Sequence, residues 1–208
     1  MTQPTTTVFV VDDDASVRRS LARLLKSAGH RVEVFSSALE FVASDWHQQN
    51  HACLVLDLSM PGLTGMELQF RLRELKSPLA IVFITGHGDI PTSVRAIKGG
   101  AVDFLPKPFE DTQLLDAVAR AIEQTRLAHK AQAELSAIQE RYASLSLRER
   151  EVMAHIVTGK LNKQVADELG TVEKTIKVHR ARVFEKMQVQ SLAELVPLAA
   201  KLGLLESK

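Results

Sequence analysis

Residues 8–29, VFVVDDDASVRRSLARLLKSAG, decide the fold: an apolar, β-branched run leads through three acids into an amphipathic segment of helical period. Val17, Leu21, Leu24 and Leu25 give that segment one apolar face. A buried strand that leads into a helix is half of a β-α-β unit, which builds a parallel sheet. The acids follow the carboxyl end of the strand, the edge at which such sheets bind ligands.

The same alternation repeats through the first half of the chain. Further apolar runs at residues 32–35, 53–56, 80–85 and 102–105 are separated by helical patterns. These runs are continuous, as expected for strands that are buried on both faces. The pattern therefore predicts an α/β domain with five parallel strands over residues 1–125.

The second half of the chain gives only helical signals. Residues 109–158 contain neither Gly nor Pro, so a long helix can leave the first domain, and we expect a helical linker at 126–144. Its stripe of Ala128, Ala131, Leu135, Ile138 and Tyr142 fits a helix that packs on a neighbour, a self-pairing seam, or a solvated connector. Four short helical patterns, at 146–157, 163–169, 172–187 and 191–202, predict a compact all-α module over 145–208.

Composition and charge restrict the function. The 208 residues are 45% hydrophobic and 25% charged, as in globular proteins, and the single cysteine, Cys53, excludes an intramolecular disulfide and a cysteine-built metal site. No long apolar span or secretory leader is apparent, so we expect a cytoplasmic protein without a membrane segment. The net charge is −3 over residues 1–125 and +3 over residues 145–208, which directs the search for nucleic-acid contacts to the second module.

Acids and a lysine follow the predicted strands of the first domain. Asp12, Asp13 and Asp57 would converge at one edge of the sheet, where all-oxygen ligands favour a hard cation such as Mg²⁺. Thr85 closes the fourth predicted strand and Lys107 follows the fifth, and both could bind phosphoryl oxygens, so the set suits phosphoryl transfer to an aspartate. The alternative for Asp13 or Asp14 is a helix N-cap. His47 and His51 lack a third ligand, which disfavours a metal site there.

Four motifs of this domain resemble the receiver domain of bacterial two-component response regulators. They read VVDDD at 10–14, LDLSMPGLTG at 56–65, VFITGHGD at 82–89 and AVDFLPKPF at 101–109. The resemblance implies a flavodoxin-like (βα)5 fold in which Asp57 accepts a phosphoryl group from a sensor histidine kinase. It also implies that Asp12, Asp13, Asp57 and the Ser59 carbonyl hold Mg²⁺, that Thr85 and Lys107 bind the phosphoryl oxygens, and that the Lys107–Pro108 bond is cis.

The same resemblance implies how the domain switches. Phosphorylation adds about 1.5 to 2 negative charges beside Thr85 and Lys107, which draws the loop after Thr85 inward. Phe104 would then rotate into the vacated space, although without the resemblance an aromatic residue at this place is read as ordinary core. The surface that includes Ile97, Phe104 and Leu114 is the expected dimerisation face.

The segment TVEKTIKVHRARVFEKM, residues 171–187, carries five Lys or Arg against two Glu. Val172, Ile176, Val183 and Met187 share one side of the helical wheel, while basic residues lie elsewhere. Such a helix suits a DNA major groove, although the same pattern also describes a solvated amphipathic helix. The preceding helical pattern at 163–169 and the tight Gly170 link give it the context of a helix-turn-helix.

Residues 145–203 resemble the four-helix LuxR/FixJ-type DNA-binding domain, through the opening LSLREREV and the segment TIKVHRARVFEKM. Leu161 and Gly170–Thr171 depart from the family pattern at places that contact DNA phosphates. The resemblance implies base contacts by Lys177 and Val178. It implies backbone contacts by six further residues: Lys163, Lys174, Thr175, His179, Arg180 and Arg182.

Together the modules resemble FixJ-type response regulators, a branch that includes regulators of aromatic catabolism. This predicts a homodimer on phosphorylation that binds promoter DNA, works with RNA polymerase and activates transcription, with Mg²⁺ as cofactor. Apart from its own phosphotransfer and slow dephosphorylation, no enzyme activity is expected. The alternatives are a Mg²⁺-dependent phosphatase, disfavoured because Ser59 stands where a second acid is needed, and a constitutive DNA binder with a degenerate receiver.

Overall fold

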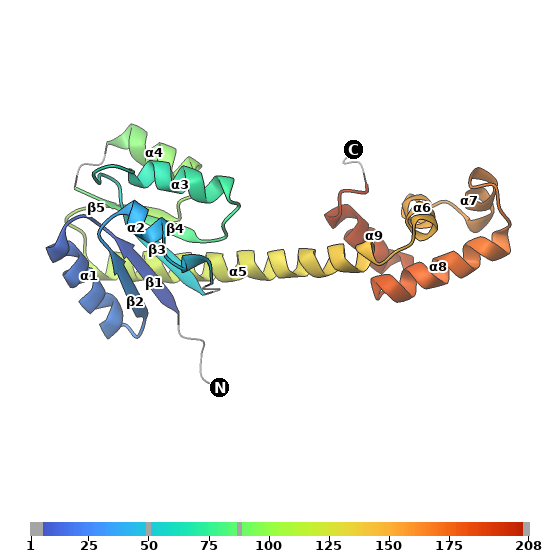
Figure 1. The fold of residues 1–208 in the computed structure, drawn as a ribbon, viewed down its shortest axis with the longest axis horizontal. Helices are drawn as coiled ribbons and strands as arrows, with labels where there is room; N and C mark the ends of the chain where they lie inside the picture. Colours follow the sequence, from blue (N-terminus) through green and yellow to red (C-terminus); the bar gives the residue numbers. More distant parts are fainter. Residues whose placement is uncertain (1–5, 49–50, 87–88, 206–208) are drawn as a thin grey trace. The chain divides into compact units, whose positions relative to one another are not determined.

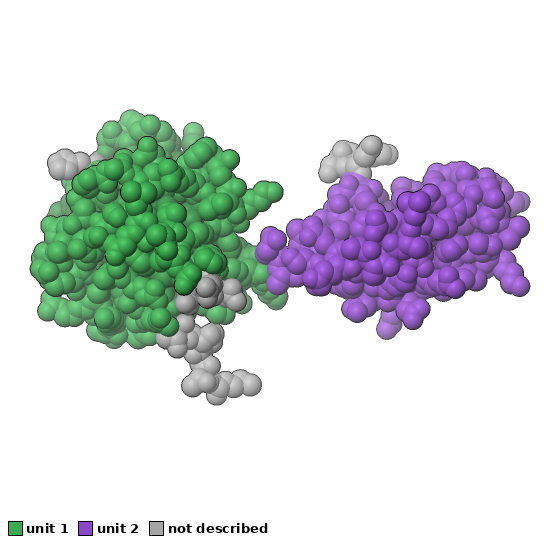
Figure 2. All heavy atoms as spheres, in the orientation of Figure 1, with its two compact units in different colours: residues 1–130 green, residues 131–208 purple. Residues whose placement is uncertain are grey.

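A computed structural model describes residues 6–48, 51–86 and 89–205. The motif residues His87 and Gly88 therefore lie outside the described part of the chain. The chain divides into two compact units, residues 1–130 and residues 131–208 (Figure 2).

The first unit is built on a parallel five-stranded sheet with the order β2-β1-β3-β4-β5 (Figure 1). The strands are β1 Thr7–Val11, β2 Arg31–Phe35, β3 Ala52–Asp57, β4 Ala80–Thr85 and β5 Asp103–Pro106. The flavodoxin-like fold is thus confirmed. Burial on both faces holds for β1, β3 and β4 but is wrong for β2 and β5, because each of these lies at an edge of the sheet and is partly exposed.

Helices cover both faces of this sheet. One face packs against α1 (Ala15–Ser27) and the first part of α5 (Asp111–Ala143). The other face packs against α2 (Ala38–Val42), α3 (Gly65–Glu74) and α4 (Ile90–Lys98), and a short 3-10 helix spans Trp46–Gln48. Leu114 of α5 is fully buried against the sheet, so its expected place on an exposed dimerisation face is wrong.

The second unit combines the end of α5 with four short helices, α6 Leu147–Ile156, α7 Asn162–Glu168, α8 Glu173–Met187 and α9 Leu192–Lys201. Ile138 and Tyr142 of α5 pack into its core, so this part of the linker stripe is core packing. Ala131 is exposed. Val172 is 64% exposed and caps the start of α8, so its expected place on the apolar side of that helix is wrong.

Candidate functional site

Two buried aspartates share one lysine at the carboxyl edge of the sheet. β1 pairs with β3 so that Val11 lies opposite Leu56, and Asp12 and Asp57 follow at the same level. Lys107, which follows β5, places its Nζ 2.7 Å from Asp12 Oδ2 and 2.8 Å from Asp57 Oδ1. Three residues far apart in the sequence therefore form one ion-paired cluster.

Burial and ion pairing compete in this cluster. Desolvation raises the pKa of Asp57 above its ordinary value, against the hydrogen bond from Lys107 that favours the carboxylate. Desolvation also disfavours the Lys107 ammonium, but its hydrogen bonds to Asp12 and Asp57 outweigh this and raise the pKa of Lys107. Both pKa values are thus raised, as expected when one ammonium is shared between two carboxylates and compensates neither charge fully. The site thus holds a charged lysine beside a carboxylate whose ionised form is poorly solvated.

The neighbouring acids take different roles. Asp14 is the N-cap of α1, with its carboxylate accepting hydrogen bonds from the backbone N–H of Ser16 and Val17. The capping alternative therefore applies to Asp14. Asp13 is exposed.

Asp12, Asp13, Asp57 and the Ser59 carbonyl provide only hard oxygen ligands, a set whose chemistry suits Mg²⁺. Yet among the described residues no three acidic, imidazole or thiol side chains are grouped so as to hold a metal ion. Lys107 bridges the carboxylates of Asp12 and Asp57, whereas Asp13 is exposed.

The loop after β3 presents Asp57 through close backbone packing. The Ser59 N–H donates a hydrogen bond of 2.8 Å to Asp57 Oδ2. A Cβ on Gly65, the first residue of α3, would lie 2.4 Å from the Asp57 carbonyl oxygen. Only glycine therefore lets α3 begin directly against the phosphoacceptor candidate, which explains the last residue of the motif at 56–65.

Thr85 and Phe104 lie on the same face of the sheet. Phe83 pairs with Phe104 in the register of β4 and β5, and their ring centroids are 6.4 Å apart. Thr85 is two residues beyond Phe83 and is buried, and its carbonyl accepts a hydrogen bond of 2.7 Å from the Lys107 N–H. The Lys107–Pro108 bond is cis, as expected. The pairing of β4 with β5 therefore places Thr85 and Phe104 on one face of the sheet and hydrogen-bonds the backbone of Thr85 to that of Lys107.

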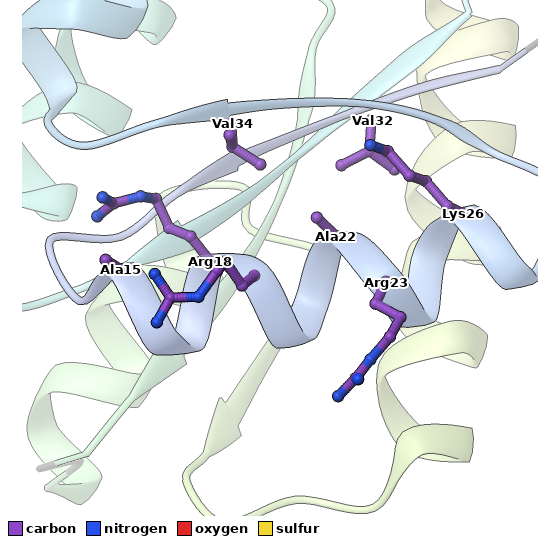
Figure 3. A pocket seen from close by; sticks show the side chains of 8 residues that line it. Ala15, Arg18, Ala22, Arg23, Lys26, Val32 and Val34 are labelled. Atoms are coloured by element: carbon purple, nitrogen blue, oxygen red, sulfur yellow. The ribbon is translucent and has the colours of Figure 1, made fainter.

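One residue of this site was not predicted from the sequence. Arg18 of α1 donates a hydrogen bond of 2.6 Å from Nη1 to the carbonyl oxygen of Asp12. It also lines a groove of about 620 Å³ between α1 and β2, in which Ala22 faces Val32 and Val34 (Figure 3). The sequence signal that could have pointed to Arg18 is its positive charge near the N-terminus of a predicted helix, where the helix dipole disfavours a cation.

The second unit presents a helix that is buried on one side and basic on the other. Ile176, Val183 and Met187 of α8 are buried in the core. Six of the predicted DNA contacts lie on α7 or on the outer part of α8, where they are exposed or half-buried: Lys163, Lys174, Thr175, Lys177, Val178 and Arg182. Lys177 pairs with Glu173 at 3.0 Å, one turn earlier.

Two predicted phosphate contacts, Arg180 and His179, are half-buried within the unit. The Arg180 guanidinium lies 5.3 Å from the centroid of the Phe184 ring and donates to Asn162 Oδ1 at 3.3 Å, which connects α8 to α7. His179 is half-buried, and its Nδ1 is buried without a hydrogen-bond partner in the described part of the chain. The turn between these helices contains Gly170 at φ +61°, a conformation that favours glycine.

A buried carboxylate ties α8 to the start of α6. Glu149 is 3% exposed and lies 2.6 Å from Lys186 Nζ, while it also accepts a hydrogen bond from the Ser146 N–H in a capping box. The Lys186 ammonium and this cap hold the pKa of Glu149 down at about 2. Glu149, the second residue of the REREV segment at 148–152, therefore connects the basic helix to the start of α6.

Among the described residues, no helix is long and apolar enough to cross a membrane. Residues 8–119 match the family of response regulator receiver domains, and residues 143–199 match the luxR family of bacterial regulatory proteins. The chain is thus covered by two family matches whose limits fall within its two compact units.

The similarity to known proteins extends over both units of the chain. The chain is 49% identical to Nodulation protein W of Bradyrhizobium diazoefficiens, over 95% of this chain and 86% of the relative. It is 46% identical to the transcriptional regulatory protein FixJ of the same organism, over 95% of this chain and 96% of the relative. The solved structure of response regulator StyR matches with a TM-score of 0.82 at 47% identity, over 95% of this chain and 100% of that one. The chain belongs to the two-component response regulators of the FixJ type, in which a receiver domain is joined to a LuxR-type DNA-binding domain.

Proposed function

We propose that Asp57 is the phosphoacceptor and that its phosphorylation by a sensor histidine kinase switches on promoter binding. The observation that carries the proposal is the buried Asp57 carboxylate hydrogen-bonded to Lys107. A carboxylate oxygen of Asp57 attacks the phosphorus of a phosphohistidine, the P–N bond breaks, and its electron pair stays on the imidazole nitrogen. Lys107 and Thr85 then bind the oxygens of the transferred group.

A bound Mg²⁺ would be held by Asp12, Asp13, Asp57 and the carbonyl of Ser59, and it would neutralise charge on the phosphoryl oxygens. The chain's own part is to keep the Asp57 oxygen oriented, through the Ser59 N–H and Lys107. The same groups support slow hydrolysis of the aspartyl phosphate, so the signal decays without another protein.

The switch is proposed to pass from the site to an exposed surface. The new charge draws Thr85 and its loop toward Asp57, and Phe104, packed on Phe83, turns into the space that is left. Val94 and Ile97 of α4 are 44% and 47% exposed, an apolar strip next to β5 that a second receiver can cover. Phosphorylation therefore promotes a homodimer through α4 and β5.

The dimer would bring two copies of α8 to two half-sites of promoter DNA. Lys177 and Val178 read base edges, and Lys163, Lys174, Thr175, His179, Arg180 and Arg182 contact the backbone. Pairing two modest contacts raises the effective affinity. We place this activity in the cytoplasm, with RNA polymerase as the partner that is recruited and an operon of aromatic catabolism as the target.

The experiment is incubation of the full-length protein with Mg²⁺ and acetyl phosphate, followed by intact-mass and oligomeric-state measurements. We expect one phosphoryl adduct, dependent on Mg²⁺, together with dimer formation. Asp57→Asn is the variant that should show neither change. An adduct of equal yield on Asp57→Asn would refute the assignment of the phosphoacceptor, and an Asp57 adduct without dimers would refute the proposed switch.

A further inference from the structure

A pocket of about 180 Å³ lies at the edge of the sheet opposite to Asp57, where the parallel strands begin. It is formed by the short 3-10 helix, the segment that joins α3 to β4, and α5, all within the first compact unit. None of its residues belongs to the phosphoacceptor site. The residues that line it are Trp46, His47, Leu75, Lys76, Ser77, Pro78, Leu79 and His129.

The wall of this pocket suits a flat apolar group. Trp46 stacks on the fully buried Phe41, with ring centroids 5.6 Å apart and an angle of 25° between the rings, which holds the indole in place. Leu75, Pro78 and Leu79 supply apolar surface, and Leu75 is 68% exposed although it is a large hydrophobic residue. A cavity of about 150 Å³ is enough to hold benzene, so this pocket has room for one aromatic ring with a small substituent.

The polar groups that line the pocket are mainly basic. Lys76, His47 and His129 contribute an ammonium and two imidazoles, and no Asp or Glu is among the lining residues. In the described parts of the chain, no hydrogen bond or ion pair engages these three side chains. Burial lowers the pKa of His129, so at neutral pH its imidazole is uncharged and has one N–H to donate. The positive charge and the free donors both favour an anion.

The backbone of Lys76 adopts a left-handed conformation, with φ at +52°. The turn closes the end of α3: the Lys76 N–H donates to the Arg73 carbonyl at 2.9 Å, and the Ser77 N–H donates to the Leu72 carbonyl at 2.9 Å. Glycine or asparagine adopts this conformation at lower cost than lysine, and residues held in such conformations cluster at ligand sites. The turn thus places a cation at the pocket in a backbone conformation that favours other residues.

We propose that this pocket binds a small carboxylate with a single aromatic ring. The ring would pack against Trp46 and the apolar wall, and the carboxylate would accept hydrogen bonds from the Lys76 ammonium and the His129 N–H. Such a ligand combines the two properties that the pocket offers, a flat apolar wall and basic donors. The proposal does not depend on phosphorylation of Asp57, because the pocket lies at the opposite edge of the sheet.

Sodium benzoate is the probe, and Trp46, the single tryptophan of the chain, reports its binding. The full-length protein should show a saturable change in Trp46 fluorescence, and equilibrium dialysis with radiolabelled benzoate should give the same dissociation constant. Benzamide keeps the shape without the charge, and cyclohexanecarboxylate keeps the charge without the aromatic ring. Both should bind at least about 5-fold more weakly than benzoate.

Variants of the lysine test the assignment of the site. Lys76→Asn removes the charge and suits the left-handed backbone, and it should weaken benzoate binding by about 10-fold, since one charge-assisted hydrogen bond is lost. Lys76→Arg keeps the charge and should retain most of the affinity. Lys130→Gln is the matched control, because Lys130 is exposed beside His129 on α5 but does not line the pocket, and it should leave benzoate binding unchanged.

A fluorescence change that does not saturate, or that is not matched by retention of benzoate in dialysis, would overturn the proposal. Equal affinity for benzamide or cyclohexanecarboxylate would also overturn it, as would an equal loss in Lys76→Asn and Lys130→Gln. Urea unfolding checks that each variant is folded. If Lys76→Asn is unfolded, His129→Ala takes its place and should weaken benzoate binding by about 5-fold; wild-type affinity in that variant would refute the site.

Discussion

Replacement of Ile138 by Ala tests whether the end of α5 is part of the DNA-binding unit. Ile138 is fully buried and belongs to the core formed with Val152, Ile156 and Val183. Replacing a buried Ile by Ala lowers the free energy of unfolding by about 2–5 kcal/mol, because less apolar surface is buried on folding and a cavity remains. We expect a loss of about 3 kcal/mol, a large part of the stability of a small unit.

The two units can be followed separately during urea unfolding. Trp46, the single tryptophan, reports the receiver, and Tyr142, the single tyrosine, lies in the second unit, while far-UV circular dichroism follows both. With a denaturant slope of about 1–1.5 kcal/mol per M, the midpoint of the second unit should fall by about 2–3 M. The Trp46 transition should not move.

Leu127→Ala is the matched control, because Leu127 lies on the same helix and is 52% exposed. It should shift neither transition by more than a few tenths of a kcal/mol. If Ile138→Ala shifts the second unit no more than Leu127→Ala does, or if both units shift together, the assignment of this part of α5 to the DNA-binding core is wrong.

Three further predictions concern charges. Lys107→Met leaves two buried carboxylates uncompensated and should lower the free energy of unfolding of the receiver by about 2 kcal/mol. Bound Mg²⁺ should restore part of this loss, which thermal melts with and without Mg²⁺ measure. A variant that melts at the same temperature as the wild-type protein would contradict the prediction. Because the Glu149 pKa is lowered from 4.5 to about 2, its stabilisation is complete above pH 4.5 and is lost as the pH falls toward 2. Glu149→Gln should remove this pH dependence, measured as the urea midpoint of the second unit, and a variant with the wild-type profile would exclude the mechanism. Arg182→Ala should reduce the slope of log K for DNA binding against log salt concentration by about 1. The control Lys201→Ala, on α9, should leave this slope unchanged. Equal slopes for the two variants would show that Arg182 does not contact DNA.

The sequence predicted the parts of the fold that depend on local pattern. The five strands, α1 and the four short helices of the second unit lie where apolar periodicity placed them, because each element buries a face that its own spacing defines. The exposed edges of β2 and β5 could not be predicted, since strand order is set by long-range pairing. Leu114 was misplaced for a related reason: whether an apolar residue of a helix faces the sheet or solvent depends on how that helix docks.

The candidate site was partly predictable. Strand ends bring Asp12, Asp57 and Lys107 together, and the position of the acids at the ends of predicted parallel strands sufficed to predict that they converge. Which acid caps α1 was left open between Asp13 and Asp14, because adjacent residues of one type differ only in backbone geometry. Arg18 was missed because a cation near the N-terminus of a predicted helix does not show which main-chain carbonyl its side chain contacts.

The central claim, that phosphorylation of Asp57 controls DNA binding, is tested most directly by promoter affinity at fixed salt with and without acetyl phosphate and Mg²⁺. The account predicts that the phosphodonor tightens binding of the full-length wild-type protein by at least about 10-fold, since a dimer engages two half-sites. Asp57→Asn should bind with one low affinity under both conditions. Equal stimulation of Asp57→Asn, or a wild-type protein that carries the phosphoryl group but binds DNA no more tightly, would contradict it.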